Sequence, residues 1–277
     1  MRPEAAVQVH HFEAMGTSCS LFAVNQPRGR LLEGEFWVRR LSAGMTRFNT
    51  DSELSRLNAC AGKWMEVSDD LESILRAALS AYAMSAGLVN VAVLPSMHAI
   101  GYTRPLAEGP SVATLDGARP LRPLPEVLEV RDREAMVAFG SGLDLGGVAK
   151  GWMADRLAQE LGPNAVANLG GDLSAVGLGP RGDGWPVGVA GQTLMLRDQG
   201  AATSSVRRRR WGGLHHLIDP RSGLPAISGL EEVSVVAASG FEAEVVAKTA
   251  LLLGPAVGPA YCAAHAMAWW LGGARDD

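Results

Sequence analysis

Cysteine and aromatic residues are scarce in this sequence. Only three of its 277 residues are cysteine (Cys19, Cys60 and Cys262), and 6% are aromatic. An odd number of cysteines without a C-x-x-C pair gives neither a disulfide framework nor a zinc pattern, so we expect buried free thiols. Charged residues make up 19% and the formal net charge is −4. That balance argues against a protein that mainly binds nucleic acid phosphates.

The sequence also lacks an uninterrupted hydrophobic run. The N-terminal stretch MRPEAAVQVHHFEAM holds no apolar segment typical of a secretory signal, so we expect a cytoplasmic protein. Residues 249–274 contain no Asp, Glu, Lys or Arg, but Gly254-Pro255 and Gly258-Pro259 interrupt them. A membrane span needs about 20 predominantly apolar residues. We therefore expect a helix end, a short second helix and a buried final strand there.

Apolar periodicity predicts helices and strands that alternate irregularly. Helices are expected at about residues 30–41, 69–87, 148–161 and 241–253, with Ser68 as the N-cap of the second. Strands are expected at 18–24, 127–130, 135–139, 233–237 and 267–271. Neither a regular βαβ period nor an internal repeat is present, which favours an α+β fold. We expect a single domain over residues 1–277.

Two motifs suggest functions that their context does not support. Gly177, Gly179 and Gly182 satisfy G-x-G-x-x-G, but Pro180 lies inside the match and Gly-Trp-Pro follows it. A dinucleotide-binding fold needs a helix at that point, so a Rossmann site is not expected. The four arginines at 207–210 are interpreted as a solvated strand leading into a turn, not as a nucleic acid or membrane surface.

Two glycine pairs mark a candidate anion site. Gly146-Gly147 precede the third predicted helix, whose first backbone N–H groups are free to face an anion. Lys150 lies in the first turn of that helix, where a cation is unfavourable to the helix dipole unless a negative charge lies nearby. Gly170-Gly171 end a short apolar run. Two such turns could hold a diphosphate between their backbones.

Two histidines precede a turn of the form Asp-Pro-x-x-Gly. His215 and His216 lie just before Asp219 and Gly223. An imidazole beside this turn would make a plausible general base. An imidazole satisfied by the carbonyl groups of the turn is an equally good interpretation at this point.

Together with segments upstream, these motifs resemble the ApbE-like flavin transferases, the FAD:protein FMN transferases. The matching segments follow the family order over essentially the whole chain: Met15–Thr17, Met45–Asn58, Gly87–Tyr102, Asp144–Gly151, Asn168–Asp172, Ala202–Ser204, His216–Pro225 and Glu244–Gly254. The resemblance implies an α+β, T-fold-related architecture with mixed or antiparallel sheets flanked by helices. It also implies an FAD cleft between subdomains.

The same resemblance implies a reaction. FMN would move from FAD to a Thr or Ser hydroxyl of an acceptor protein, and AMP would leave. Two alternatives stay open: a pyrophosphatase that splits FAD into FMN and AMP, and a non-catalytic FAD-binding protein. The expected partner is an acceptor protein, and neither nucleic acid nor a membrane span is expected.

Site residues carry over by position from the family. His216 would be the catalytic base that takes the proton from the acceptor hydroxyl. The backbone around the two glycine pairs would approach the diphosphate. The cofactor-binding set implied in this way is Met15, Phe48, Leu88, Val89, Asn90, Asp144, Gly146, Gly147, Lys150, Gly170, Gly171 and Ser204.

The metal site of the family is altered in this chain. In the family a backbone carbonyl at the Gly147 position acts with an Asp and a Thr one helical turn apart, and these two fall on Glu244 and Lys248. Mg²⁺ prefers oxygen ligands, which Glu244 offers and Lys248 does not. Our hypothesis is that Lys248 is a catalytic cation in place of the metal.

Two other interpretations of these positions stay open. Glu244 and Lys248 could simply form a salt bridge at i,i+4. Alternatively, Thr249 and Glu244 could hold Mg²⁺ at a shifted site. Two further departures from the family are Asn90 in place of the usual Asp and Ser205 in place of the usual Gly.

Overall fold

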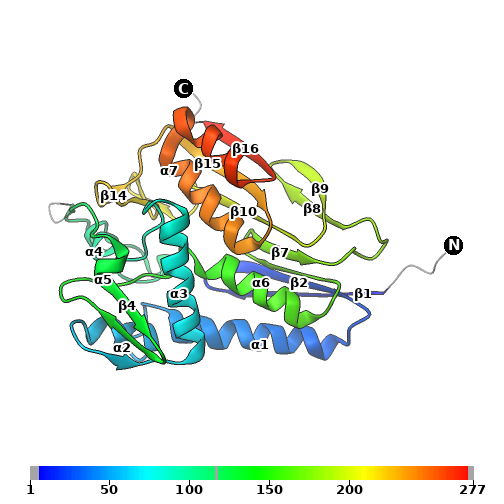
Figure 1. Ribbon diagram of the computed structural model, residues 1–277, viewed down its shortest axis with the longest axis horizontal. Helices are drawn as coiled ribbons and strands as arrows, with labels where there is room; N and C mark the ends of the chain where they lie inside the picture. The colour runs from blue at the N-terminus through cyan, green and yellow to red at the C-terminus, as the bar shows by residue number, and fades with distance from the viewer. Residues whose placement is uncertain (1–5, 116–117, 274–277) are drawn as a thin grey trace.

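The centre of the structure is a seven-stranded sheet. The structure is a computed structural model that describes residues 6–115 and 118–273. The strand order is β1-β2-β6-β7-β10-β15-β16, and each strand pairs antiparallel with its neighbours (Figure 1). Its strands are β1 (Val7–Ala14), β2 (Thr17–Val24), β6 (Ala165–Leu169), β7 (Asp172–Val176), β10 (Gln199–Ser205), β15 (Leu230–Ala237) and β16 (Ala268–Gly273).

Helices cover one face of this sheet, and a hairpin covers the other. Helices α1 (Arg28–Met45), α6 (Ala149–Leu161) and α7 (Gly240–His265) lie on the same face (Figure 1). The hairpin of β8 (Trp185–Val189) and β9 (Gln192–Leu196) packs apolar side chains, among them Trp185, against the opposite face. Because β2 alternates, Leu21 belongs to the helix-side core whereas Phe22 packs toward the hairpin.

Smaller elements lie at one end of the sheet. A three-stranded sheet has the order β3 (Met65–Glu66), β5 (Glu134–Val137), β4 (Leu128–Arg131). Around it lie α2 (Glu53–Ala59), α3 (Asp69–Met84), α4 (Leu94–Ala99), η1 (Leu106–Glu108) and α5 (Leu124–Val127). Two short hairpins follow, β11 (Arg210–Trp211) with β12 (Leu214–His215) and β13 (Ile218–Asp219) with β14 (Leu224–Pro225).

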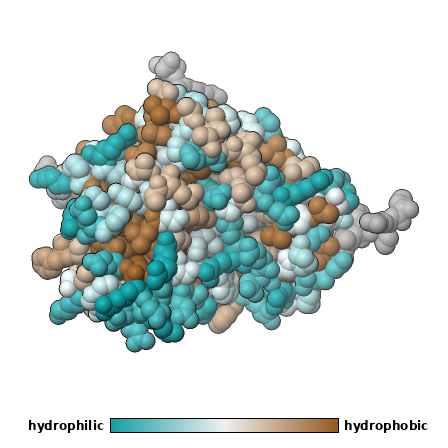
Figure 2. Space-filling view, in the orientation of Figure 1, coloured by the Kyte–Doolittle hydropathy of each residue, from teal (hydrophilic) through white to brown (hydrophobic). Residues whose placement is uncertain are grey.

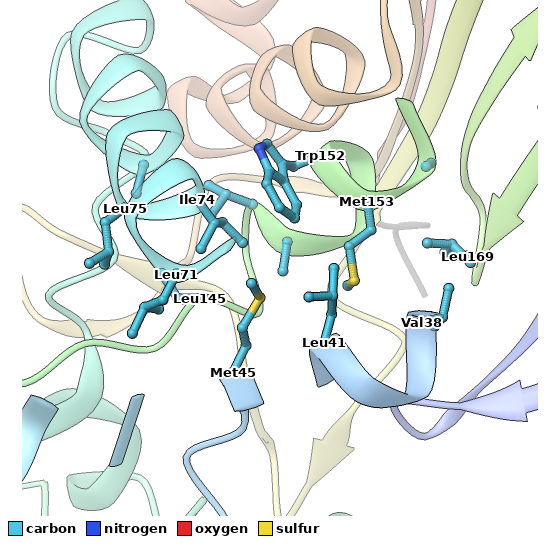
Figure 3. Close-up of a cluster of buried hydrophobic side chains, with 14 of the residues drawn as sticks. Val38, Leu41, Met45, Leu71, Ile74, Leu75, Leu145, Trp152, Met153 and Leu169 are labelled. Carbon is cyan, nitrogen blue, oxygen red and sulfur yellow. The ribbon is translucent and has the colours of Figure 1, made fainter. Parts of the chain in front are cut away.

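The largest core cluster joins these parts. Figure 3 shows side chains from α1, α3 and α6 meeting there, with Trp152 and Met153 of α6 in the middle. Leu71, Ile74 and Leu75 are at most 1% exposed and contribute the buried face of α3. On the outer surface, hydrophilic residues cover much of the face over α1, whereas hydrophobic residues gather near α4 and α5 (Figure 2).

Glycines bring α6, α7 and β10 close together. A Cβ on Gly151 would lie 2.5 Å from the carbonyl oxygen of Gly240, and a Cβ on Gly200 would overlap the backbone of the same residue. Asp155 of α6 accepts hydrogen bonds from the first amides of α7, at 2.7 Å from Gly240 and 2.9 Å from Phe241. The start of α7 is therefore fixed against α6, which brings side chains of the two helices into one site.

The predicted α+β class is confirmed, and all four predicted helices are present. Ser68 caps α3 as expected, because its hydroxyl accepts from the amide of Leu71. Strands β1, β6, β7 and β10 were not predicted as such, although they form most of the sheet. The expectation of a buried final strand was wrong. Strand β16 is only half-buried, since it forms an edge of the sheet with β15 as its neighbour.

The apolar C-terminal run forms the end of α7 and strand β16. Helix α7 is kinked at Gly254, whose φ is 75°, so the expected second short helix is present. This helix is long and apolar enough to cross a membrane by length and composition alone, but 56% of its most apolar window is buried inside the protein. Burial of this kind is typical of a core helix.

Candidate active site

A cavity of about 520 Å³ opens where the two glycine turns, the turn between β1 and β2, the end of β10 and α7 meet. It has four cationic and three acidic side chains, a formal balance of 4 − 3 = +1. Such a balance favours an anionic ligand. The lining residues are Glu13, Gly16, Thr17, Ser18, Gly146, Lys150, Gly170, Asp172, Thr203, Ser204, Ser205, Arg208, Arg209, His216, Leu217, Glu244 and Lys248.

Glu244 is the buried centre of the helix side of this cavity. It is 3% exposed, and its Oε2 accepts a hydrogen bond of 2.9 Å from the amide of Gly151. Its Oε1 lies 3.6 Å from Nζ of Lys150 and 3.8 Å from Nζ of Lys248. One carboxylate thus binds the amino-terminal turn of α6 and balances two lysines, so the anion expected at this helix start includes a side chain of the protein itself.

Lys150 lies between two carboxylates. Its Nζ pairs with Oδ2 of Asp172 and faces Glu244. Burial lowers the pKa of Lys150 to about 8, although the Glu244 carboxylate opposes this shift. The first-turn lysine therefore has its negative charges supplied by the protein, and its ammonium is held in place at the cavity wall.

Lys248 reaches the first glycine turn from α7. Its Nζ donates a hydrogen bond to the carbonyl oxygen of Gly147. Burial lowers the pKa of Lys248, and the carboxylates of Glu244 and Asp144 oppose that shift. The neighbouring Thr249 does not line the cavity, because its hydroxyl donates to the carbonyl of Val245 at 2.7 Å within the same helix.

The two adjacent histidines have different environments. His215 is held by the backbone: its Nε2 lies 3.0 Å from the carbonyl oxygen of Ala226, and its Nδ1 accepts from the amide of Leu217 at 3.3 Å. His216 lines the cavity, and its buried Nδ1 has no hydrogen-bond partner among the described residues. The structure thus places His215 on backbone groups and His216 in the cavity lining, and the role of His216 as a base stays a prediction.

The imidazole of His216 is neutral at ordinary pH. Burial lowers its pKa well below the usual value of 6.5, and the nearby cations Arg209, Lys248 and Lys150 lower it further. A neutral imidazole has a free lone pair, so it can accept a proton without first losing one.

The predicted solvated run is exposed at Arg207, Arg208 and Arg210, whereas Arg209 is half-buried. Arg208 donates to the carbonyl of Gly170 at 3.2 Å, and Arg209 donates to the carbonyl of Met15 at 3.4 Å. Both line the cavity because the chain turns there, with Arg209 at φ 48°. Arg207 does face outward and pairs with Glu231.

An aromatic group with a buried arginine adjoins the first glycine turn. Oδ1 of Asp144 accepts from the amide of Gly146 at 2.8 Å, and its Oδ2 pairs with Nε of Arg47 at 2.5 Å. The guanidinium carbon of Arg47 lies 4.2 Å from the ring centre of Phe48 and 4.6 Å from that of Tyr102. Both Nη atoms of Arg47 are buried without a hydrogen-bond partner in the described part of the chain.

Comparisons with known proteins agree with this arrangement. The model of the ApbE family matches residues 15–270. The chain belongs to the ApbE family.

Its relatives and structural neighbours carry related names. An FAD:protein FMN transferase of Klebsiella pneumoniae (strain 342) is 29% identical over 245 residues, 78% of this chain and 72% of the relative. One of Treponema pallidum is 30% identical over 243 residues, 74% of this chain and 66% of the relative. The flavin transferase ApbE of Vibrio cholerae superposes with a TM-score of 0.80 at 21% identity, covering 97% of each chain. The apo flavinyl transferase ApbE of Pseudomonas stutzeri gives 0.81 at 21% identity, over 98% of this chain and 96% of that one.

Within this ApbE fold, the cavity collects many of the predicted site residues but not all of them. His216, Lys248, Lys150, Glu244, Gly146, Gly170 and Ser204 line it, and the carbonyl of Gly147 contacts Lys248. Arg208 and Arg209 were missed. The sequence signal that could have identified them is their position a few residues after the Ala-Thr-Ser segment of β10, which ends at the cavity.

The remaining predicted cofactor residues lie outside the cavity lining. Val89 is buried in the main core, and Leu88 beside it is half-buried. The Asn90 amide donates to the carbonyl of Arg122 and accepts from the amide of Ala92, both at 2.9 Å. The amide of Gly171 donates to Oδ1 of Asn168.

Two further predicted residues adjoin the cavity through their neighbours. Met15 has its carbonyl on Arg209, and Phe48 stacks with Arg47. The cofactor roles of the residues outside the lining stay predictions.

Proposed function

We propose that this ApbE-family protein is an FAD:protein FMN transferase that moves FMN from FAD to a Ser or Thr hydroxyl of an acceptor protein and releases AMP. The observation that carries the proposal is His216, a neutral buried imidazole with an unpartnered nitrogen in a wall of cations. A base beside an anion-binding cavity is what transfer of a phosphoryl group to a hydroxyl requires. The names of the curated relatives support the same reaction.

The cavity supplies the groups that a diphosphate needs. Arg208 and Arg209 each have a guanidinium anchored on one backbone carbonyl, which leaves further N–H donors for phosphate oxygens. Lys150 and Lys248 add ammonium groups from the helix side. Gly146 and Gly170 of the two glycine turns also line the cavity. Charge neutralisation by preorganised donors is the main source of catalysis in phosphoryl transfer.

In the proposed transfer step, His216 acts as the base. The acceptor hydroxyl oxygen forms a bond to the phosphorus on the riboflavin side of the diphosphate. The bond from that phosphorus to the bridging oxygen breaks, and AMP leaves with the electron pair. The proton of the hydroxyl passes to the lone pair of His216 and later to solvent.

The aromatic group beside the cavity offers a place for the flavin. Phe48 is 39% exposed, Tyr102 lies 5.5 Å from it between ring centres, and Trp211 lies 5.2 Å from Tyr102. Aromatic faces suit a planar ring system, and the unpartnered Nη atoms of Arg47 suit carbonyl oxygens of the flavin. Since Asp144 joins Arg47 to the glycine turn, the flavin and diphosphate subsites are connected.

Incubation with FAD and a peptide bearing a Ser/Thr-Gly-Ala-Thr/Ser-like segment tests the proposal. We expect covalent flavin fluorescence on the peptide together with an equal amount of AMP. FMN and AMP without an adduct would instead identify an FAD pyrophosphatase. Intact FAD after incubation would leave only a binding protein and would contradict the proposed transfer.

A further inference from the structure

We propose that the ammonium of Lys248 replaces the divalent cation in this protein, so that it binds FAD and transfers FMN without a bound metal. The inference rests on the proposed function and assigns the cation within the same cavity. It is carried by what each member of the expected metal site contacts.

The residues at these positions do not fit a divalent ion. The carbonyl oxygen of Gly147 already accepts a hydrogen bond from Nζ of Lys248. The Glu244 carboxylate is shared among the amide of Gly151 and two lysines. The third position is Lys248 itself, which offers an ammonium and no oxygen. Within residues 6–115 and 118–273, no group of three or more His, Cys, Asp or Glu side chains is placed to hold a metal ion.

The shifted site with Thr249 has no geometric support. The Thr249 side chain is buried within α7, with the residue 1% exposed, and its hydroxyl donates to a carbonyl of its own helix. It would have to change rotamer and leave that bond to reach the cavity. Lys248, by contrast, already lies between the carbonyl and the carboxylate that a cation would contact.

Lysine is a rare residue in this chain, which makes its placement informative. There are 22 arginines but only three lysines, Lys63, Lys150 and Lys248, and two of the three line this cavity. An ammonium is a compact point charge, whereas a guanidinium is a broad planar fork. A Cβ on Gly147 would lie 2.6 Å from Nζ of Lys248, so the glycine leaves the room that the ammonium takes.

The charge of the cavity depends on Lys248. With it, the four cations exceed the three carboxylates by one, and without it the balance would be 3 − 3 = 0. Its single charge acts together with Lys150, Arg208 and Arg209. The fixed ammonium can therefore assist the neutralisation of a diphosphate that a divalent ion would otherwise provide.

The test compares wild-type protein with three variants, in EDTA and in Mg²⁺. Lys248→Met removes the ammonium, and Lys63→Met is a matched control because Lys63 is the exposed third lysine. Glu244→Asp combined with Lys248→Thr restores the Asp and Thr of the family. For each we measure FAD affinity by calorimetry, FMN transfer to the acceptor peptide, and binding of Mg²⁺ alone. Thermal unfolding shows which variants are folded.

We expect wild type and Lys63→Met to bind FAD equally in EDTA and in Mg²⁺, within about twofold, and to bind no Mg²⁺ alone. Lys248→Met should weaken FAD affinity or transfer at least about tenfold. The double variant should bind Mg²⁺ and need it for FAD. Transfer or FAD binding by the wild type that is lost in EDTA and restored by Mg²⁺ would overturn the proposal, as would unchanged kinetics and FAD affinity in a folded Lys248→Met variant.

These outcomes separate the two proposals. A wild type that binds FAD in EDTA but forms no adduct under any condition would contradict the transferase function and leave the role of Lys248 supported. A wild type that forms the adduct only with Mg²⁺ would support the transferase function and contradict the proposed role of Lys248.

Discussion

The two walls of the cavity differ in how their cations are held. On the helix side, Lys150 and Lys248 are paired with buried carboxylates. On the other side, Arg208 and Arg209 contact backbone carbonyls, and neither forms an ion pair with a carboxylate within the described ranges 6–115 and 118–273. The cations of the helix wall therefore have carboxylate partners inside the protein, whereas Arg208 and Arg209 have only backbone partners among the described residues.

The two adjacent histidines also differ in how their ring nitrogens are held. His215 has both ring nitrogens engaged by the backbone, while the buried Nδ1 of His216 has no hydrogen-bond partner among the described residues. An unpaired buried polar atom is costly and points to a ligand or a catalytic role. We expect the two walls and the two histidines to respond differently to substitution.

The largest expected effect is on the transfer step. His216→Ala should lower the transfer rate by about 10²–10⁴-fold, the range typical for loss of a general base, while FAD remains bound. The matched control His215→Gln keeps a donor for the carbonyl of Ala226 and should transfer FMN at close to the wild-type rate. Single-turnover kinetics with saturating FAD measure both. Transfer retained by His216→Ala, or FAD binding lost in it, would contradict the role of the base.

Substitution of the carboxylate on the helix side of the cavity should lower the stability of the fold. Glu244→Gln leaves two half-buried lysines with less negative charge beside a fully buried position, so we expect the free energy of unfolding to fall by about 3 kcal/mol or more. The exposed pair Arg131–Glu134 is the comparison, since Glu134→Gln should cost at most about 1 kcal/mol. Denaturant titrations give both values. Equal costs for the two substitutions would show that Glu244 is not the centre of a buried cluster.

Substitution of Arg208 or Arg209 on the other side of the cavity should lower the affinity for FAD. Arg208→Met and Arg209→Met should each weaken FAD binding by about tenfold or more, because a hydrogen bond to a charged group contributes about 1.5–3 kcal/mol. Arg207→Met is the control, as Arg207 faces Glu231 outside the cavity. Calorimetry at fixed ionic strength is the measurement. Similar weakening in all three variants would indicate general surface charge and no specific contact.

The smallest expected effect concerns pH. Because the pKa of His216 lies well below 6.5, the imidazole is neutral throughout the range above that value, and protonation at lower pH should remove activity. Burial, helped by the nearby cations Arg209, Lys248 and Lys150, keeps the pKa low in the free protein. We expect kcat/KM for FAD to change less than twofold between about pH 7.5 and 6.5. A base with an ordinary pKa would be about half protonated at the lower limit, so a twofold loss there would contradict this environment.

Much of the site was predictable because its parts are local in sequence. The glycine pairs, the turn after the histidines and the helix starts each follow from a few neighbouring residues, and Lys150 was placed correctly in a first helical turn. The residues around the turn could not choose between His215 and His216, whereas the family resemblance pointed to His216. That choice depends on the carbonyl of Ala226, which lies across a hairpin.

The parts of the site and the fold that were not predicted depend on contacts between residues far apart in the sequence. Arg208 and Arg209 were interpreted as part of a solvated run because no neighbouring residue in the sequence indicates their hydrogen bonds to the carbonyls of Gly170 and Met15. The strands β6 and β7 were missed for a related reason. They are short and are stabilised by pairing with β2 and β10 more than by a pattern of their own.

The most direct test of the whole account is a crystal structure of the wild-type protein soaked with FAD in the presence of Mg²⁺. We predict that the diphosphate lies within hydrogen-bond distance of Lys248 and of Arg208 or Arg209, with His216 beside the phosphorus on the flavin side. A dinucleotide bound away from His216, or a metal ion between the diphosphate and Glu244, would contradict it.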